Sequence, residues 1–116
     1  MKLRVLFLCN RNCLRSPTAE RIFSEDSRLE VRSAGVDSDA TVQVTRELLE
    51  WADVIFVMER RQRNLVHQRF ADLYRAKPII CLYIPDEYAL MDPALIELLR
   101  TRVAPHLAPL LSAPPS

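Results

Sequence analysis

Apolar runs alternate with amphipathic segments along this chain. Residues 3–8 form one apolar run, and residues 53–58 form a second behind a single charge. Continuous apolar runs rich in β-branched residues are typical of strands buried on both faces of a parallel sheet. Two shorter strands are predicted at residues 29–32, closed by Ser33-Ala34-Gly35, and at residues 78–84.

The segments between these strands have the spacing of helices. A first helix is predicted from Pro17 to about residue 26, because proline suits the first turn of a helix. Helices are also predicted from residue 42 to 52 and from residue 59 to about 74. Asp92 followed by Pro93 is a cap and first-position signature for a last helix.

Alternating strands and helices predict an α/β fold with a three-layer, four-stranded parallel sheet and helices on both faces. Ligands of such sheets bind beyond the carboxyl ends of the strands, which here are the loops after residues 8, 32 and 84. We interpret residues 1–116 as one domain. Four prolines predict that the tail from about residue 104 to 116 is irregular or loosely packed: Pro105, Pro109, Pro114 and Pro115.

Composition narrows the function classes. The chain has 116 residues, 49% hydrophobic and 27% charged, with a net charge of +1, which argues against a nucleic-acid partner. No apolar stretch reaches membrane length, and the first run is too short for a signal peptide. Three cysteines argue against a disulfide framework and, with the two histidines, form no metal-ligand pattern. The expected location is therefore the cytoplasm, without membrane association, metal or cofactor.

The loop after the first strand carries the candidate chemistry. Cys9 ends the strand, and Arg15, Ser16 and Pro17 begin the helix. Backbone N–H groups of such a loop and the arginine fork can wrap a phosphate, and the same positive field stabilises a thiolate. Ser16 can donate a hydrogen bond to the sulfur, and Asp86, after the fourth strand, is placed to act as a general acid. The predicted phosphate-binding residues are Asn10, Arg11, Asn12, Cys13, Leu14, Arg15 and Ser16.

The motif Cys-x5-Arg-Ser at the end of the first strand resembles the low-molecular-weight protein tyrosine phosphatases. Asn12 matches a loop asparagine of that family that adopts a left-handed conformation, and Ser33-Ala34-Gly35 and residues 52–58 match its second and third strands. The resemblance implies a phosphotyrosine phosphatase I-like fold with strand order 2-1-3-4. It also implies a two-step reaction in which Cys9 forms a phosphocysteine, while Asp86 protonates the leaving group and then activates water.

Two assignments within this resemblance have alternatives. The family's acid loop reads Asp-Pro, an order found here at Asp92-Pro93, whereas Pro85 precedes Asp86. We assign the acid to Asp86 and a helix cap to Asp92. Cys13 is either a partner for Cys9 in a reversible disulfide or a loop cysteine that offers only its N–H.

Three functions follow from these residues. The favoured one is a cysteine-dependent phosphatase acting on phosphotyrosine in a phosphorylated protein or on a small aryl phosphate, and binding inorganic phosphate or another oxyanion. The second is an arsenate reductase-like redox enzyme, for which Cys81 is the available distal cysteine. The third is a non-catalytic phosphate-binding regulatory module. The oligomeric state is not indicated by the sequence.

Overall fold

A computed structural model describes residues 2–112 of the chain. The strands are β1 (Leu3–Cys9), β2 (Leu29–Gly35), β3 (Val54–Val57) and β4 (Ile79–Cys81). The helices are α1 (Arg15–Phe23), α2 (Arg46–Trp51), α3 (Arg60–Arg69), α4 (Ala71–Ala76) and α5 (Pro93–Leu111).

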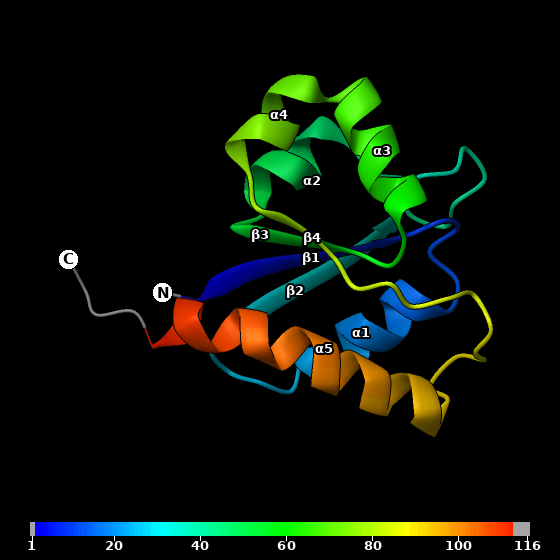
Figure 1. Cartoon of the computed structure of the whole chain (residues 1–116), viewed down its shortest axis with the longest axis vertical. Coiled ribbons are helices and arrows are strands. Elements are labelled where there is room, and N and C mark those ends of the chain that lie inside the picture. The colour runs from blue at the N-terminus through cyan, green and yellow to red at the C-terminus, as the bar shows by residue number, and fades with distance from the viewer. Residues whose placement is uncertain (1, 113–116) are drawn as a thin grey trace.

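The four strands form one parallel sheet in the order β2-β1-β3-β4, which confirms the predicted fold class and strand order. Helices α1 and α5 cover one face of the sheet, and α2, α3 and α4 cover the other (Figure 1). β1 lies between β2 and β3, so the strand order reverses beside its carboxyl end. In an open α/β sheet this switch point is where ligands bind.

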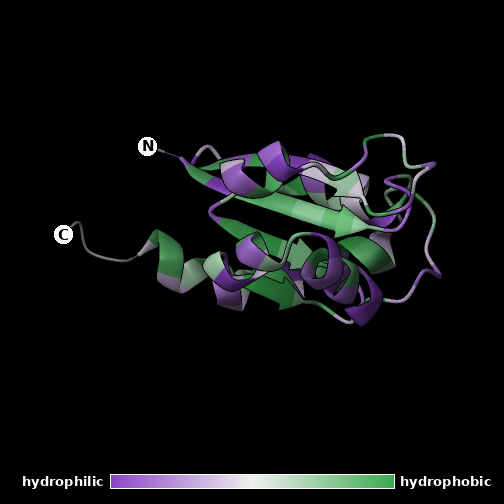
Figure 2. Cartoon of the chain, turned by 90° about the horizontal axis from the view of Figure 1, so that it is seen from above, coloured by the Kyte–Doolittle hydropathy of each residue, from purple (hydrophilic) through white to green (hydrophobic). Residues whose placement is uncertain are grey.

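The apolar runs of the sequence become the core. Residues 5–8 of β1 and all four residues of β3 are buried, which is why these strands are apolar on both faces. On the α1 and α5 face, the ring of Phe7 stacks on the rings of Phe23 and Phe56, with centroids 5.4 Å apart in each pair. Figure 2 shows the hydrophobic strands enclosed between the two helix layers.

Two of the helices predicted from the sequence differ from those in the structure: one begins later, and the other is divided in two. α2 begins at Arg46 rather than at residue 42, because Thr45 is extended and its hydroxyl accepts the Leu48 N–H. Residues 42–44 instead run beside the end of β2, where Gly35 bonds to Val42 and Val44. The predicted helix over residues 59–74 is two helices, α3 and α4, which meet at Phe70 with φ −136° and ψ 55°.

The prediction of an irregular tail from residue 104 is wrong for the residues that the structure describes. α5 continues to Leu111 with Pro105 and Pro109 inside it, and residues 113–116 lie outside the described part. Both prolines are exposed, so the carbonyls that lose a helical partner face solvent, while the buried side chains of Val103 and Leu107 hold the helix on the sheet. Neither α5 nor another helix within residues 2–112 combines the length and apolar character needed to cross a membrane.

Candidate active site

The candidate site lies where the loops after β1, β2, β3 and β4 come together, on the right of Figure 1. A small cavity of about 130 Å³ opens there. Its walls include Cys9, Cys13, Arg15 and Asp86, with Asn10, Arg11 and Leu14 completing the lining. Residues 9–16 are the eight first-loop residues predicted to bind phosphate or act in catalysis. Six of them therefore meet Asp86, from the loop after β4, around one hollow.

Cys9 forms the floor of this cavity. It is 3% exposed, at the carboxyl end of the central strand β1. Its Sγ lies 3.0 Å from Ser16 Oγ and accepts the Asn12 N–H at 3.2 Å. A backbone N–H therefore donates to the sulfur, and the Ser16 hydroxyl lies within hydrogen-bond distance of it.

Asn12 has the left-handed backbone conformation expected from the sequence, with φ 56°. Its side-chain amide donates to Ser16 Oγ at 3.0 Å and to Ser33 Oγ at 2.9 Å. Ser33 in turn donates to a carboxylate oxygen of Glu20 on α1. This chain of hydrogen-bonded polar groups fixes the Ser16 hydroxyl beside the sulfur. It also gives the polar side chains of the loop hydrogen-bond partners within the protein.

Arg15 is 2% exposed, and its guanidinium is held from two sides. Nη1 donates to Glu59 Oε1 at 2.6 Å and to the Ile84 carbonyl at 2.8 Å. Nε lies 3.7 Å from Asp86 Oδ1. The Glu59 and Ile84 contacts use Nη1 and fix the orientation of the planar fork, which leaves the edge formed by Nε and Nη2, beside Asp86, for an oxyanion.

The loop rests on Gly35, the only glycine in the chain. A Cβ at this position would lie 2.6 Å from the Asn10 carbonyl oxygen and 2.8 Å from the Asn12 backbone nitrogen. The backbone on both sides of this contact is also joined, because the Val36 N–H donates to the Cys9 carbonyl and the Asp37 N–H to the Asn10 carbonyl. The glycine is thus required for close approach of two backbones and not for an unusual φ.

The start of α3 holds the other side of the loop. Asn10 Oδ1 accepts hydrogen bonds from Arg61 Nη1 at 2.6 Å and from Gln62 Nε2 at 2.8 Å. Gln62 is fully buried, and its Oε1 accepts the Glu59 N–H. Glu59, Arg61 and Gln62 therefore couple one helix start to both ends of the loop after β1.

Two loop side chains point away from Cys9. Arg11 pairs with Asp39 at 3.2 Å, and both side chains are exposed. Cys13 is exposed, with its Sγ 3.5 Å from the Arg11 carbonyl and 4.0 Å from Thr41 Oγ1. All three cysteines are free in this structure, so whether Cys9 and Cys13 pair on oxidation stays a prediction.

The two candidate acids have different surroundings. Asp86 lines the small cavity beside Arg15, and its side chain is largely exposed. Asp92 caps α5 by accepting the Ala94 N–H at 2.9 Å, which confirms its predicted structural role. Of the two carboxylates, only Asp86 lines the cavity that Cys9 also lines.

The sequence does not predict the contacts by which five side chains from other elements hold the loop, which are Glu20, Ser33, Glu59, Arg61 and Gln62. Glu59, Glu20 and the Ser33 hydroxyl hold Arg15 and Asn12, yet Glu59 was interpreted only as the start of a helix. Its position directly after β3, at the carboxyl edge of the sheet, was the available signal, and the same signal identified Asp86. Within residues 2–112, no three His, Cys, Asp or Glu side chains gather as a metal site would require.

No protein-family model matches the sequence, and a search of curated proteins gives no match. Solved structures do match. SP-PTP, a low molecular weight protein tyrosine phosphatase from Streptococcus pyogenes, is 20% identical with a TM-score of 0.78, covering 97% of this chain and 95% of that one. The arginine phosphatase YwlE from Geobacillus stearothermophilus is 21% identical with a TM-score of 0.73, covering 98% and 99%.

A third match is the tyrosine phosphatase Wzb from Escherichia coli K30 in complex with phosphate. It is 21% identical with a TM-score of 0.72, covering 91% of this chain and 96% of that one. These similarities show that the chain has the fold of the low-molecular-weight phosphatases over nearly its whole length. The fold expected from the Cys-x5-Arg-Ser motif is confirmed.

Proposed function

We propose that this protein is a cysteine-dependent phosphatase that hydrolyses phosphotyrosine or small aryl phosphate monoesters through a phosphocysteine. The observation that carries the proposal is the placement of Cys9 Sγ at the floor of a cavity that Arg15 and Asp86 also line, where Sγ accepts the Asn12 N–H and lies 3.0 Å from Ser16 Oγ. A tetrahedral oxyanion in that cavity would sit at the amino-terminal end of α1, where helix amides and Arg15 attract negative charge.

In the first step, the Cys9 thiolate attacks phosphorus in line with the ester oxygen. The S–P bond forms as the P–O bond breaks, and Asp86 gives its proton to the departing oxygen. The arginine fork and the loop amides are fixed before the reaction by Glu59, Gly35 and Asn12, so they need little reorganisation as charge moves onto the equatorial oxygens.

In the second step, Asp86 accepts a proton from water, which attacks phosphorus as the P–S bond breaks. The Cys9 sulfur leaves as a thiolate and phosphate is released. Ser16 Oγ, 3.0 Å from the sulfur, donates to it as the negative charge returns. Asn12 holds this hydroxyl in place through its side-chain amide.

The redox enzyme and the phosphate-binding module fit the positions of Cys81 and Asp86 less well than a phosphatase does. Cys81 lies in β4 and packs against the core on the α2 face, which is a poor position for a thiol that relays a disulfide to Cys9. A purely phosphate-binding module has no need for a carboxylate placed as Asp86 is. Tyrosine phosphatases and an arginine phosphatase both share this fold, and we propose the aryl esters as substrates of this chain.

The proposed partners are a phosphorylated protein or a small aryl phosphate, together with inorganic phosphate. We propose the cytoplasm as the location, since three free cysteines suit a reducing compartment.

The test is hydrolysis of p-nitrophenyl phosphate in the presence of a chelator. We expect turnover that vanadate inhibits and that Cys9→Ser abolishes. Cys81→Ser is the matched control and should retain turnover. Hydrolysis that persists in Cys9→Ser would refute the proposal, and thiol-dependent arsenate reduction lost in Cys81→Ser would support the redox alternative instead.

A further inference from the structure

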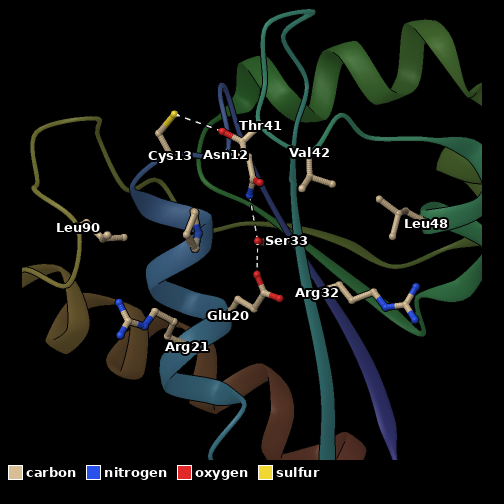
Figure 3. A pocket seen from close by; sticks show the side chains of 11 residues that line it. Asn12, Cys13, Glu20, Arg21, Arg32, Ser33, Thr41, Val42, Leu48 and Leu90 are labelled. Atoms are coloured by element: carbon tan, nitrogen blue, oxygen red, sulfur yellow. Dashed lines mark hydrogen bonds between the residues drawn. The ribbon is translucent and has the colours of Figure 1, made fainter.

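A second, larger cavity of about 610 Å³ lies beside the phosphate loop. It extends around the free edge of β2. Glu20 and Ser33 line it from the α1 side, and Arg32 and Leu48 line it from the α2 side (Figure 3). Because side chains of adjacent strand residues point to opposite faces, a hollow lined by both Arg32 and Ser33 must lie along the strand edge.

The backbone of β2 is open along this edge. β2 is the outermost strand, and its register pairs it with β1 alone. At Gly35 the outward-facing backbone groups already have partners, because the N–H donates to the Val42 carbonyl and the carbonyl accepts the Val44 N–H. Alternate residues of a parallel strand direct their backbone groups to the same side, so those of Ser33 and Val31 also face outward. Among residues 2–112, no strand continues the pairing at these two positions.

The large cavity adjoins the small oxyanion cavity at Cys13, which lines both. In register, Gly35 lies opposite Cys9, so Ser33 is two residues, or roughly 7 Å, back along the neighbouring strand. A chain whose phosphate occupies the site above Cys9 would reach this edge within about three or four extended residues.

Apolar side chains stand at the rim of the large cavity. Val42 is 46% exposed and Leu90 45% exposed, and Pro17 of α1 also lines the hollow. The guanidinium groups of Arg21 and Arg32 project toward opposite edges of the hollow in Figure 3. The Glu20 carboxylate is held by the Ser33 hydroxyl. The centre of the cavity is therefore left to apolar contacts.

We infer that this cavity and the β2 edge bind the polypeptide of a phosphoprotein substrate, as an extended segment flanking the phosphorylated residue. The inference rests on the proposed phosphatase function and specifies its substrate class. Backbone groups of Val31 and Ser33 would bond to the segment, while alternate apolar side chains of the segment would enter the hollow near Val42, Leu48 and Leu90.

The combination of features favours a polypeptide over a small apolar ligand. A small apolar ligand would use the hollow but not the row of backbone donors and acceptors at Val31 and Ser33. An extended chain needs both, because each of its own N–H and C=O groups requires a partner once water is removed. The shared wall at Cys13 links this surface to the site of chemistry rather than to a separate function.

The test compares phosphotyrosine peptides with p-nitrophenyl phosphate. One peptide series carries alternating leucines on the amino-terminal side of phosphotyrosine and another carries them on the carboxyl-terminal side. Each is matched by a peptide with serines at the same positions. We expect one leucine series to exceed its serine match about tenfold in kcat/KM, the scale of one buried apolar side chain.

Variants Val42→Asp and Leu90→Asp should remove this preference, measured as the ratio of peptide to p-nitrophenyl phosphate kcat/KM. Leu110→Asp is the matched control, since Leu110 is 44% exposed and lies near the far end of α5. Equal kcat/KM for leucine and serine peptides in both series would overturn the inference. So would a change in oligomeric state on Val42→Asp, because the cavity would then serve contact between copies. An absence of p-nitrophenyl phosphate hydrolysis by the wild type would overturn the proposed function instead.

Hydrogen exchange gives a second readout with Cys9→Ser, which holds the peptide without cleavage. Bound leucine peptide should slow exchange of the Val31 and Ser33 amides, which face the open edge. Inorganic phosphate alone should not slow them. Protection by phosphate alone, or an absence of protection by the bound peptide, would contradict strand addition at β2.

Discussion

Glu59 Oε1 lies 2.6 Å from Arg15 Nη1, and this contact joins the start of α3 to the guanidinium that would hold the transferred phosphoryl group. Arg15 is almost fully buried, whereas Glu59 remains partly open to solvent. The carboxylate therefore orients the fork at the cost of bringing a negative charge toward the oxyanion site. Substitutions of Glu59 can separate its effect on the orientation of Arg15 from the effect of its negative charge.

We expect Glu59→Ala to lower kcat/KM for p-nitrophenyl phosphate about tenfold, because a hydrogen bond to a charged group is lost and Arg15 is less well oriented. Glu59→Gln keeps an acceptor oxygen and removes the charge, so it should retain most of the activity and bind phosphate at least as tightly as the wild type. Steady-state kinetics with phosphate inhibition measure both effects. Equal losses in the two variants would show that charge, not orientation, is the contribution of Glu59.

Gly35→Ala should damage the loop although Gly35 has no positive φ. The added methyl would meet the Asn10 carbonyl, the Asn12 nitrogen and Ala40 Cβ, all within 2.8 Å. Relief requires the loop to move, and we expect a stability loss of about 1–3 kcal/mol with a fall in kcat/KM of at least tenfold. Urea unfolding and p-nitrophenyl phosphate kinetics test this. Ala40→Gly in the same chain would remove one of the three contacts and should restore part of the stability only, since both backbone contacts remain.

Asp86→Asn should lower kcat/KM by about 10²- to 10⁴-fold for phosphate esters with poor leaving groups, and much less for activated ones, because only a poor leaving group needs the proton in the first step. Asp92→Asn is the matched control. It should change the helix cap of α5 and leave the dependence on the leaving group as in the wild type. The assignment fails if Asp92→Asn shows the steep dependence and Asp86→Asn does not.

Asp72 couples α4 to α2 through a bidentate contact with Arg46 at 2.9 and 3.0 Å. Hydrogen bonding to this guanidinium lowers the pKa of Asp72 from 3.8 to about 2. A carboxyl with a lowered pKa in the folded state stabilises the protein above its unfolded pKa, and this contribution is lost as pH falls through the folded value. The difference in urea midpoint between wild type and Asp72→Asn should therefore persist down to about pH 4 and shrink toward about pH 2. The effect should be small, because both side chains are solvent-exposed.

The sequence predicted the sheet and the grouping of the first-loop residues well because both depend on local patterns. The apolar runs around Phe7 and Phe56 could fit only a sheet covered on both faces, and Cys9, Arg15 and Ser16 stand close together in one loop. The contacts of Glu59 with Arg15 and of Glu20 with Ser33 join residues 44 and 13 positions apart, and no spacing rule reports them. The sequence does not predict the extent of α5, because its prolines indicate a break in the helix. The side chains of Val103 and Leu107, which are buried and hold the helix against the sheet, are apparent only in the structure.

The central claim is that phosphate passes through Cys9 Sγ. Asp86→Asn mixed briefly with p-nitrophenyl phosphate should accumulate the intermediate, because the activated leaving group departs readily while attack by water lacks its base. After acid quenching and proteolysis, mass spectrometry should find one phosphoryl group on the peptide that contains Cys9. In the double variant Cys9→Ser/Asp86→Asn, no other cysteine should carry a phosphoryl group. Turnover with a phosphoryl group on a different residue, or with no covalent phosphate at any time point, would contradict the account.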